Sequence, residues 1–551
     1  MGIKEISSES QVHSVSLRHK ERGEIGNGKL SFSTGIWTTV LLKNPLPMEF
    51  SAGESIDQLQ AITDGGRVYT LWSCQLNDSA IYAEYLFEGD IAAPEFDQII
   101  VRYSDISEWF LHWQNIEGSI GEQLTWTQNS KPLSVIVSTD EDQFKLTSEY
   151  VGTIDKQGED RILHEHIEFC FKSTKGKFIL ADLRNKIHEL SCLLSLLIAY
   201  PVTIASTVVR LENERDYPVH FLTFERPKRD LKDSGFWLKF FIQKPVIEER
   251  WQIVFDNYYR SKYRKLCWIR LAGLQRYEGF WEYKVLGYVS LLDSYVTIST
   301  EGKKKPEPCS KKILRFRNEI TTAFPQLDEV DHSKLEEIAS RVFSSKGVLN
   351  FFDKYQLVIG SIDPDITKII SFSEECFNLT KRIRNAIAHG DDPELSSSEF
   401  SKIGEIVGKI TLLLTYLAFL DFGLTKDDFI NALKKTFNPL HYVANLDNFH
   451  LDRVTEPDKF FSVTEKTFNE LKKISELRTS LCFVRNASGK LDYSKKYTFM
   501  YKDSLKDKTG GRLKIENIFG VDENAVEYLG FGYFEYEENR LKVYNMWIIN
   551  P

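Results

Sequence analysis

The chain has 551 residues, enough for about two to four domains, and its 42% hydrophobic and 27% charged residues are ordinary values for a globular protein. The formal net charge of −9 excludes a globally basic surface, so any contact with nucleic acid must come from a local patch. Seven dispersed cysteines without a CxxC pair argue against a disulfide framework or a zinc site, and favour reduced thiols in the cytoplasm.

The first 180 residues carry the pattern of a β-rich domain. The first 28 residues contain no apolar stretch, so we expect no signal peptide there. Short β-type runs separated by turn residues follow, and this pattern is typical of an antiparallel sandwich or barrel-like domain. The runs lie at 29–42, 67–76, 80–87, 98–103, 133–138 and 166–171.

Two features of this front region have simple structural explanations. His164 and His166 lie two residues apart on a predicted strand, a spacing that can bind metal, but no further ligand is recognisable nearby and a polar strand face is the simpler interpretation. Segment 190–209 has no formal charge and is long enough to span a membrane, but Pro201 would break such a helix. We therefore expect a buried helix at 183–199, a strand at 202–209, and no membrane association.

After residue 275 apolar residues recur every three to four positions, which predicts a helical bundle. The predicted helices lie at 277–298, 311–323, 331–344, 364–388, 396–422 and 426–437. The C-terminal part returns to mixed signals, with a predicted helix at 462–478 and predicted strands in LCFVRN, YTFMYK, YLGFGYFEY and LKVYNMWII. The predicted fold class is α+β, with a β-rich domain at 1–270, a helical domain at 271–438 and a small α/β appendage at 439–551.

One predicted helix has both of its ends marked in the sequence. Asp363 suits the N-cap and Pro364 the first helical position. Gly390 stands where a left-handed residue ends a helix, and Pro393 prevents the helix from resuming. His389 therefore lies in the last turn, where the exposed carbonyl groups interact favourably with a cation.

The end of this helix reads Arg384-Asn385-Ala386-Ile387-Ala388-His389. Asn385 and His389 are four residues apart and share a face, and the long side chain of Arg384 can reach the same phosphate. A guanidinium suits phosphate and an imidazole suits proton transfer near neutral pH, as RNA transesterification requires. Since the 2′-hydroxyl of RNA is the nucleophile, this chemistry needs no metal. The alternative is that Arg384 and His389 merely complement a helix C-terminus.

In this helical setting, the run resembles the signature of HEPN ribonucleases, an arginine commonly followed by asparagine with a histidine four to six residues on. The front region resembles the N-terminal domain of ApeA-type anti-phage proteins in GKLSFSTGIW, RVYTLWSCQ, DISEWF at 105–110 and the apolar stretch 190–205. The C-terminal appendage has no counterpart in this resemblance.

The resemblance implies an RNA-cleaving defence effector that stays inactive until a phage-derived trigger is present, and then cleaves host RNA, tRNA among the expected substrates, in abortive infection. It also implies a homodimer or higher homo-oligomer with two motifs facing one cleft. Arg384 would bind the scissile phosphate, His389 would transfer protons, and Asn385 would orient them. We expect no cofactor and no metal.

A basic strip in the same domain fits RNA binding. Between residues 303 and 317, seven cations stand against the single Glu307, a net charge of +6 that could follow a phosphate backbone. A solvated loop is the alternative. The expected RNA-binding residues are Lys303, Lys304, Lys305, Lys311, Lys312, Arg315 and Arg317, together with Arg382.

Two other functions remain open at this point. The helical domain could be a non-catalytic dimerisation or RNA-binding module, and loss of RNA cleavage in His389→Ala would distinguish this from a ribonuclease. The β-rich front could bind a sugar or a peptide through its Trp and Tyr residues, although packing explains these aromatics equally well.

Overall fold

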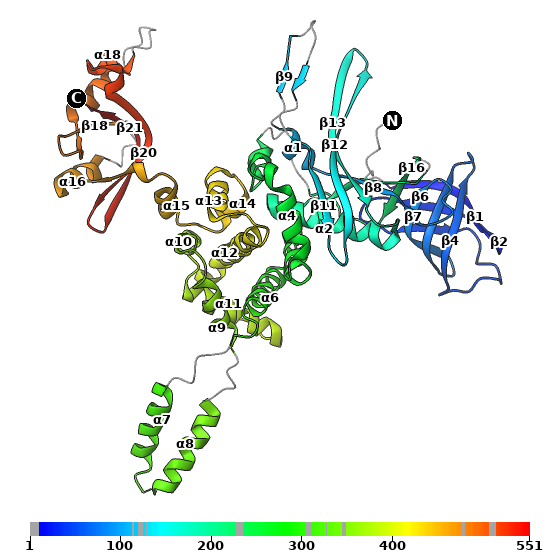
Figure 1. Cartoon of the computed structure of the whole chain (residues 1–551), viewed down its shortest axis with the longest axis horizontal. Helices are drawn as coiled ribbons and strands as arrows, with labels where there is room; N and C mark the ends of the chain where they lie inside the picture. The colour runs from blue at the N-terminus through cyan, green and yellow to red at the C-terminus, as the bar shows by residue number, and fades with distance from the viewer. Residues whose placement is uncertain are drawn as a thin grey trace. The chain divides into compact units, whose positions relative to one another are not determined.

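The computed structural model describes residues 10–112, 115–119, 125–127, 131–212, 214–227, 235–303, 310–326, 328–343, 349–474, 480–505 and 514–550. The chain divides into two compact units, Met1–Leu446 and Asp447–Pro551 (Figure 1). The first unit holds the β-rich region and the helical bundle, and the second is a small α/β structure.

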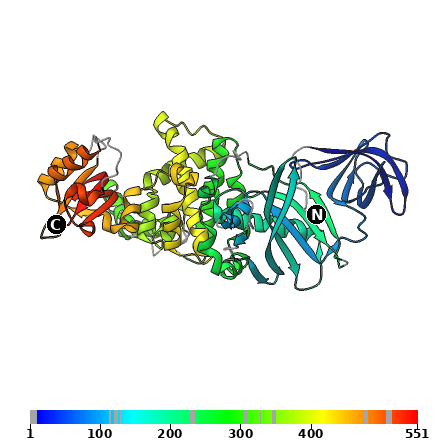
Figure 2. The ribbon, with the colours of Figure 1, turned by 90° about the horizontal axis from the view of Figure 1, so that it is seen from above.

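The first unit begins with a closed, six-stranded antiparallel barrel. Its strand order is β6-β3-β2-β1-β4-β5, and β5 pairs back onto β6 (Figure 2). Inward-facing apolar residues such as Leu17, Leu30 and Leu71 fill it. The predicted barrel-like fold is confirmed, but run 29–42 forms parts of two strands, because Gly35 turns the chain at a φ of 78°. The strands are β1 (Gln11–His19), β2 (Gly23–Phe32), β3 (Thr38–Leu42), β4 (Ser55–Thr63), β5 (Val68–Leu76) and β6 (Ala80–Glu88).

An antiparallel sheet continues from β6 in the order β16-β15-β8-β13-β12-β11. The long helix α2 (Leu180–Ile198) packs beside it, and the Tyr103 hydroxyl donates to the Ile187 carbonyl at 2.7 Å. The expected helix and the strand after it are both present. The strands are β8 (Gln98–Tyr103), β11 (Ser134–Ser138), β12 (Gln143–Gln157), β13 (Asp160–Ser173), β15 (Ile204–Arg210) and β16 (Asp216–Phe221).

Short helices follow and lead into the bundle. They are α4 (Trp251–Arg260) and α5 (Ile269–Gln275). The bundle is built around α6 (Trp281–Ser299), which packs against α9, α11 and α12. Its other helices are α9 (Phe351–Ile359), α10 (Pro364–Ile370), α11 (Glu374–His389), α12 (Ser397–Asp421), α13 (Lys426–Lys435) and α14 (Pro439–Val443).

The prediction of a single helix at 364–388 is wrong, because two helices occupy this stretch. Ser371 adopts a left-handed conformation with a φ of 53° and ends α10. The Ser371 carbonyl accepts a hydrogen bond from Lys409 Nζ at 2.9 Å, which replaces the hydrogen bond that a continuing helix would have supplied. Asp363 caps α10, as expected of an N-cap, while α11 starts separately from Ser373, whose side chain accepts from the Cys376 amide.

Helix α12, with 25 residues, is the longest of the described helices. By length and composition it could cross a membrane, but 83% of its most apolar window is buried inside the fold. A core helix of a globular protein has the same composition. Segment 190–209 instead forms the end of α2 and most of β15, as the position of Pro201 predicts.

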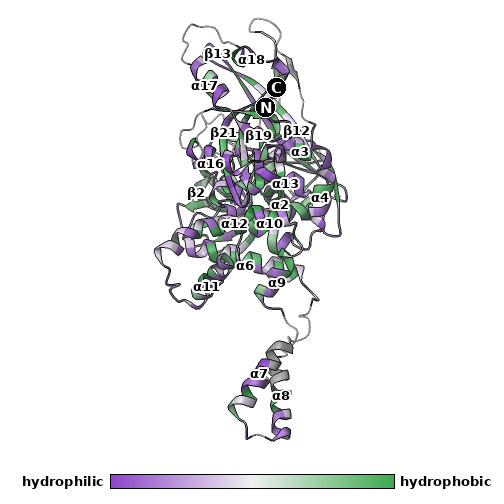
Figure 3. Ribbon diagram, turned by 90° about the vertical axis from the view of Figure 1, so that its left-hand side faces the viewer, coloured by the Kyte–Doolittle hydropathy of each residue, from purple (hydrophilic) through white to green (hydrophobic). Residues whose placement is uncertain are grey.

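Two more helices, α7 (Ser310–Ala323) and α8 (Glu329–Phe343), pack along each other and match the predicted spans to within two residues. Hydrophilic residues lie in the described part of both helices (Figure 3). Lys303, which precedes α7, is exposed.

The second unit has a five-stranded sheet of order β17-β20-β21-β18-β19, with apolar clusters on both faces. The strand predicted in YTFMYK is wrong. This stretch lies in helix α17 (Lys495–Ser504), because Ser494 caps it and Tyr497 and Tyr501, one turn apart, both contact Phe519. The other elements are α15 (Asn448–Thr455), β17 (Phe460–Ser462), α16 (Glu465–Ile474), β18 (Leu481–Arg485), β19 (Leu491–Tyr493), α18 (Ile515–Phe519), β20 (Val526–Tyr536) and β21 (Asn539–Ile549).

Candidate active site

The candidate site is the C-terminal end of α11. Gly390 adopts the left-handed conformation with a φ of 79°, as its place in the sequence predicts. The Gly390 amide donates to the Ile387 carbonyl and the Asp391 amide donates to the Ala386 carbonyl, so the helix ends in a Schellman motif. The buried side chains of Phe377, Thr380 and Ile383 pack one face of the helix into the bundle. The last turn is thus fixed by backbone bonds and by packing.

Arg384 and Asn385 are half-buried and touch each other. Arg384 Nη1 donates to Asn385 Oδ1 at 3.3 Å, and Arg384 Nη2 lies 3.4 Å from Asp293 Oδ2 on α6. The side chain of Arg384 is 36% exposed, so its guanidinium is anchored on one side and open to solvent on the other. Such a group can donate to a phosphate oxygen without moving far.

His389 is exposed at the last residue of α11. None of the residues that the structure describes hydrogen-bonds its imidazole. Both ring nitrogens are therefore available to a substrate or to a second protein chain, as proton transfer requires.

A groove of about 770 Å³ lies beside this helix end. The start of α6 and the turn after α11 line it, and three exposed aromatic side chains project there: Phe280 is 73% exposed, Tyr283 60% and Phe400 53%. Asp391 and Asp392 line the same groove. Asp392 Oδ1 accepts from the Glu394 amide at 2.9 Å, so its carboxylate stabilises the turn.

Arg382, one of the expected RNA-binding residues, is engaged within the protein. Its Nη2 lies 2.6 Å from Glu399 Oε1, beside the start of α12. Hydrogen bonds from the Ser396 amide and hydroxyl, together with the Arg382 guanidinium, lower the pKa of Glu399 to about 2. A phosphate would have to displace this carboxylate to reach Arg382.

The remaining basic residues lie away from these contacts. Arg315 is exposed and pairs with Glu319 at 2.9 Å on the same helix, α7. Lys311, Lys312 and Arg317 also belong to α7, and their helical backbone is what the structure describes. Lys304 and Lys305 lie outside the described residues. Among the residues that the structure describes, no contact joins the basic strip to Arg384.

The histidine pair of β13 does not form a shared site. His164 is exposed beside Asp155, with 3.5 Å between His164 Nε2 and Asp155 Oδ2, whereas the buried His166 contacts Glu168 at 3.1 Å. In the part of the chain that the structure describes, no group of three or more His, Cys, Asp or Glu residues is arranged to hold a metal ion.

Sequence reasoning missed Asp293 and the aromatic groove. Asp293 is 91 residues from Arg384 and meets it because α6 packs against α11. The signal that could have found the groove is the cluster Phe280-Trp281-Glu282-Tyr283, since large aromatics at the start of a helix cannot all face one core.

Two family models match the chain. The model for ApeA N-terminal domain 1 matches residues 19–258, and the model for Apea-like HEPN matches residues 286–428. The second match includes Asp293, Arg384, Asn385 and His389. The comparisons with curated proteins and with solved structures gave no match.

Proposed function

Since the chain belongs to the ApeA-type HEPN proteins, we propose that it is an endoribonuclease of anti-phage defence that cleaves host RNA, tRNA included. HEPN domains are generally endoribonucleases. The observation that carries the proposal is the arrangement at the end of α11, where a half-exposed guanidinium, an amide and an exposed imidazole occupy one helix end.

In the proposed reaction the 2′-hydroxyl of RNA attacks the adjacent phosphorus, and the bond from phosphorus to the 5′-oxygen breaks. Arg384 binds the phosphate oxygens and offsets their developing charge. His389 transfers a proton, either from the 2′-hydroxyl or to the leaving 5′-oxygen. Asn385 accepts from Arg384 Nη1 and so limits the directions in which the guanidinium can point.

We propose that the active species is a homodimer or higher homo-oligomer, in which two copies of the motif face one cleft. In the proposed cleft, Arg384 of one chain and His389 of the other would act on the same phosphate, and water would take part in the second proton transfer. The exposed position of His389 supports this, because the imidazole is accessible to a second copy of the chain.

Affinity for RNA is proposed to come from the basic strip at 303–317. Its cations would contact the phosphate backbone without taking part in the chemistry. The exposed Lys303 and Arg315 support this role. Arg382 would contribute only if a phosphate displaced Glu399.

We propose that successive parts of the chain have different roles. Residues 1–270 would sense a phage-derived trigger and regulate the helical domain at 271–438, which would cut RNA in the cytoplasm and so abort the infection. The separation of the last 105 residues into their own compact unit supports a distinct task for this part.

The proposal is tested by sequencing RNA ends in phage-infected cells that express the wild type, Arg384→Ala or His389→Ala. Both variants should abolish cleavage while the thermal unfolding midpoint stays near that of the wild type, because both side chains lie at an exposed helix end. The matched control is Arg382→Ala, two residues away on the same helix, which should retain cleavage. Wild-type cleavage by either variant would show that the site is elsewhere.

The reaction type has its own test. Protein purified in its activated form from phage-infected cells should cleave RNA in excess EDTA and leave a 2′,3′-cyclic phosphate on one product and a 5′-hydroxyl on the other. Activity that disappears on chelation, returns with magnesium and leaves 5′-phosphates would replace the proposed step with hydrolysis by metal-bound water.

A non-catalytic role is the second candidate, and one contact favours it. The ion pair between Arg384 and Asp293 ties α11 to α6, so Arg384 could serve packing alone. In that case the wild type would leave cellular RNA intact, and Arg384→Ala would lower the stability of the protein.

A further inference from the structure

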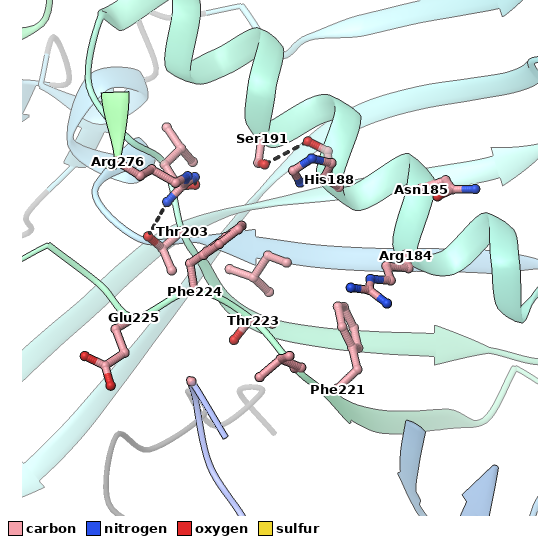
Figure 4. Close-up of a pocket in the computed structure, with 14 residues that line it drawn as sticks. Arg184, Asn185, His188, Ser191, Thr203, Phe221, Thr223, Phe224, Glu225 and Arg276 are labelled. Atoms are coloured by element: carbon pink, nitrogen blue, oxygen red, sulfur yellow. Dashed lines mark hydrogen bonds between the residues drawn. The ribbon is translucent and has the colours of Figure 1, made fainter. Parts of the chain in front are cut away.

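The first unit contains a pocket of about 530 Å³, remote in sequence from the HEPN motif. One wall is α2, where Arg184, Asn185, His188 and Ser191 occupy one helix face (Figure 4). The other walls come from the start of β15, the end of β16 with the segment after it, and Arg276 just beyond α5. Pockets of this size typically hold small molecules.

Arg276 is the residue of the pocket that best indicates the charge of a ligand. Its guanidinium donates to Thr203 Oγ1 at 3.2 Å and to the Val202 carbonyl, and it lies 5.0 Å from the centre of the Phe224 ring. Among the described residues, no carboxylate lies within ion-pair distance of it. Burial lowers the pKa of Arg276, as expected of a cation without a counter-charge. A mostly desolvated cation beside a cavity favours an anionic ligand.

A second polar group faces the cavity without a partner. Thr223 is 8% exposed, lines the pocket, and its hydroxyl has no hydrogen-bond partner in the described structure. Since a buried hydroxyl without a partner costs free energy, the pocket is suited to a ligand that carries a hydrogen-bonding group there. Figure 4 shows Thr223 between Arg276 and Arg184.

The remaining lining adds apolar surface and charge of both signs, since the carboxylate of Glu225 also lines the pocket. Arg184 lies on the side opposite Arg276, and although it pairs with Glu84 at 3.2 Å, its side chain is 49% exposed. Ile204 and the rings of Phe221 and Phe224 provide apolar contact. Two guanidinium groups, an apolar floor and an unsatisfied hydroxyl are together suited to a molecule with an anionic end, a planar part and hydroxyl groups.

We propose that this pocket binds a nucleotide, with Arg276 on its phosphate, Thr223 on a polar group of its sugar, and the side of the pocket with Arg184 and Phe221 against its base. The ligand class goes beyond the proposed ribonuclease function and does not depend on it. Guanidinium forks match phosphate oxygens in geometry, and nucleobases pack against aromatic rings.

The position of the pocket connects it to the HEPN domain. Arg276 stands five residues before α6, and Leu274 packs so closely on α6 that a Cβ on Gly287 would lie 2.7 Å from Leu274 Cδ2. A ligand that holds Arg276 therefore acts on the segment that leads into the helix carrying Asp293. Any effect on RNA cleavage rests on the proposed function, whereas binding itself does not.

The test is calorimetry of the full chain with the four ribonucleoside 5′-monophosphates, their nucleosides and ribose 5-phosphate. At least one nucleotide should bind, and its nucleoside and ribose 5-phosphate should each bind at least tenfold more weakly. Arg276→Gln should weaken that nucleotide roughly tenfold or more, since it removes charge-assisted hydrogen bonds. Arg22→Gln, in an exposed ion pair outside the pocket lining, is the control and should bind normally.

Because Arg276 also donates to the Val202 carbonyl, its substitution affects the fold as well as binding. Ile204→Trp is therefore a second variant, which fills the cavity with both arginines in place. Near-UV circular dichroism shows which variant keeps the fold, and a folded variant must lose binding. The proposal is overturned if no nucleotide binds the wild type at 1 mM, if ribose 5-phosphate binds as tightly as the nucleotide, or if a folded Ile204→Trp binds like the wild type. The proposal is also overturned if the nucleoside binds as tightly as the nucleotide.

Discussion

Arg384 is shared between two partners before any substrate arrives. Asp293 and Asn385 hold its guanidinium at 3.4 and 3.3 Å, and a phosphate must compete with the Asp293 carboxylate. The pair is partly exposed, with Arg384 36% and Asp293 27% accessible, so it contributes only modestly to stability. Its main consequence is for the electrostatics of the proposed phosphate site.

We expect Asp293→Asn to tighten RNA binding by roughly two- to fivefold at low salt, because an exposed ion pair is worth up to about 1 kcal/mol and the variant removes the competing anion. Fluorescence anisotropy of labelled RNA, in a His389→Ala background that prevents cleavage, measures this. Asp331→Asn on α8 is the control for the general change in charge. Weaker binding in Asp293→Asn would mean that Asp293 chiefly positions Arg384 for the phosphate.

At the scale of elements, the end of α11 depends on one backbone conformation. Gly390 has a φ of 79°, and a Cβ there would meet nothing within 4 Å. Any cost of Gly390→Ala therefore comes from the left-handed backbone, and we expect a loss of about 1 kcal/mol in the free energy of unfolding.

Gly404, exposed within α12, is the matched control, because it also has open space at its Cβ position but lies in the helix interior. Gly404→Ala should raise the free energy of unfolding by about 0.5–1 kcal/mol. Urea denaturation of the two variants measures both changes. Equal effects of the same sign would contradict the role of the left-handed cap.

A salt bridge joins the segment before α4 to α13 within the first unit. Arg250 donates to both carboxylate oxygens of Asp428, at 2.8 and 2.9 Å. Burial raises the pKa of Asp428, but the hydrogen bonds from Arg250 and Thr425 outweigh it and lower the pKa to about 2. Since the folded pKa lies below the unfolded value, the stabilisation is present above about pH 4 and is lost as the pH falls toward 2.

Asp428→Asn should therefore lower the free energy of unfolding at pH 7 by about 1–2 kcal/mol, and the difference from the wild type should shrink between pH 4 and pH 2. Asp427→Asn, at the exposed neighbouring position, should change little at either pH. Urea titrations across this pH range provide the measurement. A difference that is constant with pH would contradict the assigned pKa of Asp428.

For the whole molecule, the proposed composite cleft has a direct test. Mixing inactive Arg384→Ala and His389→Ala chains should restore part of the RNA cleavage, because a dimer of the two retains an Arg384 and a His389 from different chains. Gel-based cleavage assays of the mixture and of each variant alone measure this. An active enzyme that sediments strictly as a monomer would contradict a shared cleft.

The second unit has apolar cores on both faces of its sheet, built around Phe483 and Phe534 on one side and Phe519 on the other. We expect residues 447–551 to fold when expressed alone, since these cores lie entirely within the unit. A cooperative thermal transition followed by circular dichroism, with dispersed NMR signals, is the expected result. A chain without a transition would show that the unit needs the rest of the protein.

Local patterns in the sequence determined much of this protein. Apolar periodicity placed most of the bundle helices but not α9, turn residues separated the strands, and Gly390 marked the end of the motif helix, because each of these signals acts through neighbours in the chain. The motif was recognisable for the same reason, since Arg384, Asn385 and His389 lie within six residues.

Where local signals were absent or ambiguous, only the tertiary structure determined the secondary structure and the contacts. The break at Ser371 is stabilised by Lys409 from another helix, and YTFMYK is helical because its tyrosines pack on Phe519. The contact of Asp293 with Arg384 and the pocket around Arg276 join residues far apart in the chain. Such contacts depend on the packing of whole elements, whose energies no short window of sequence contains.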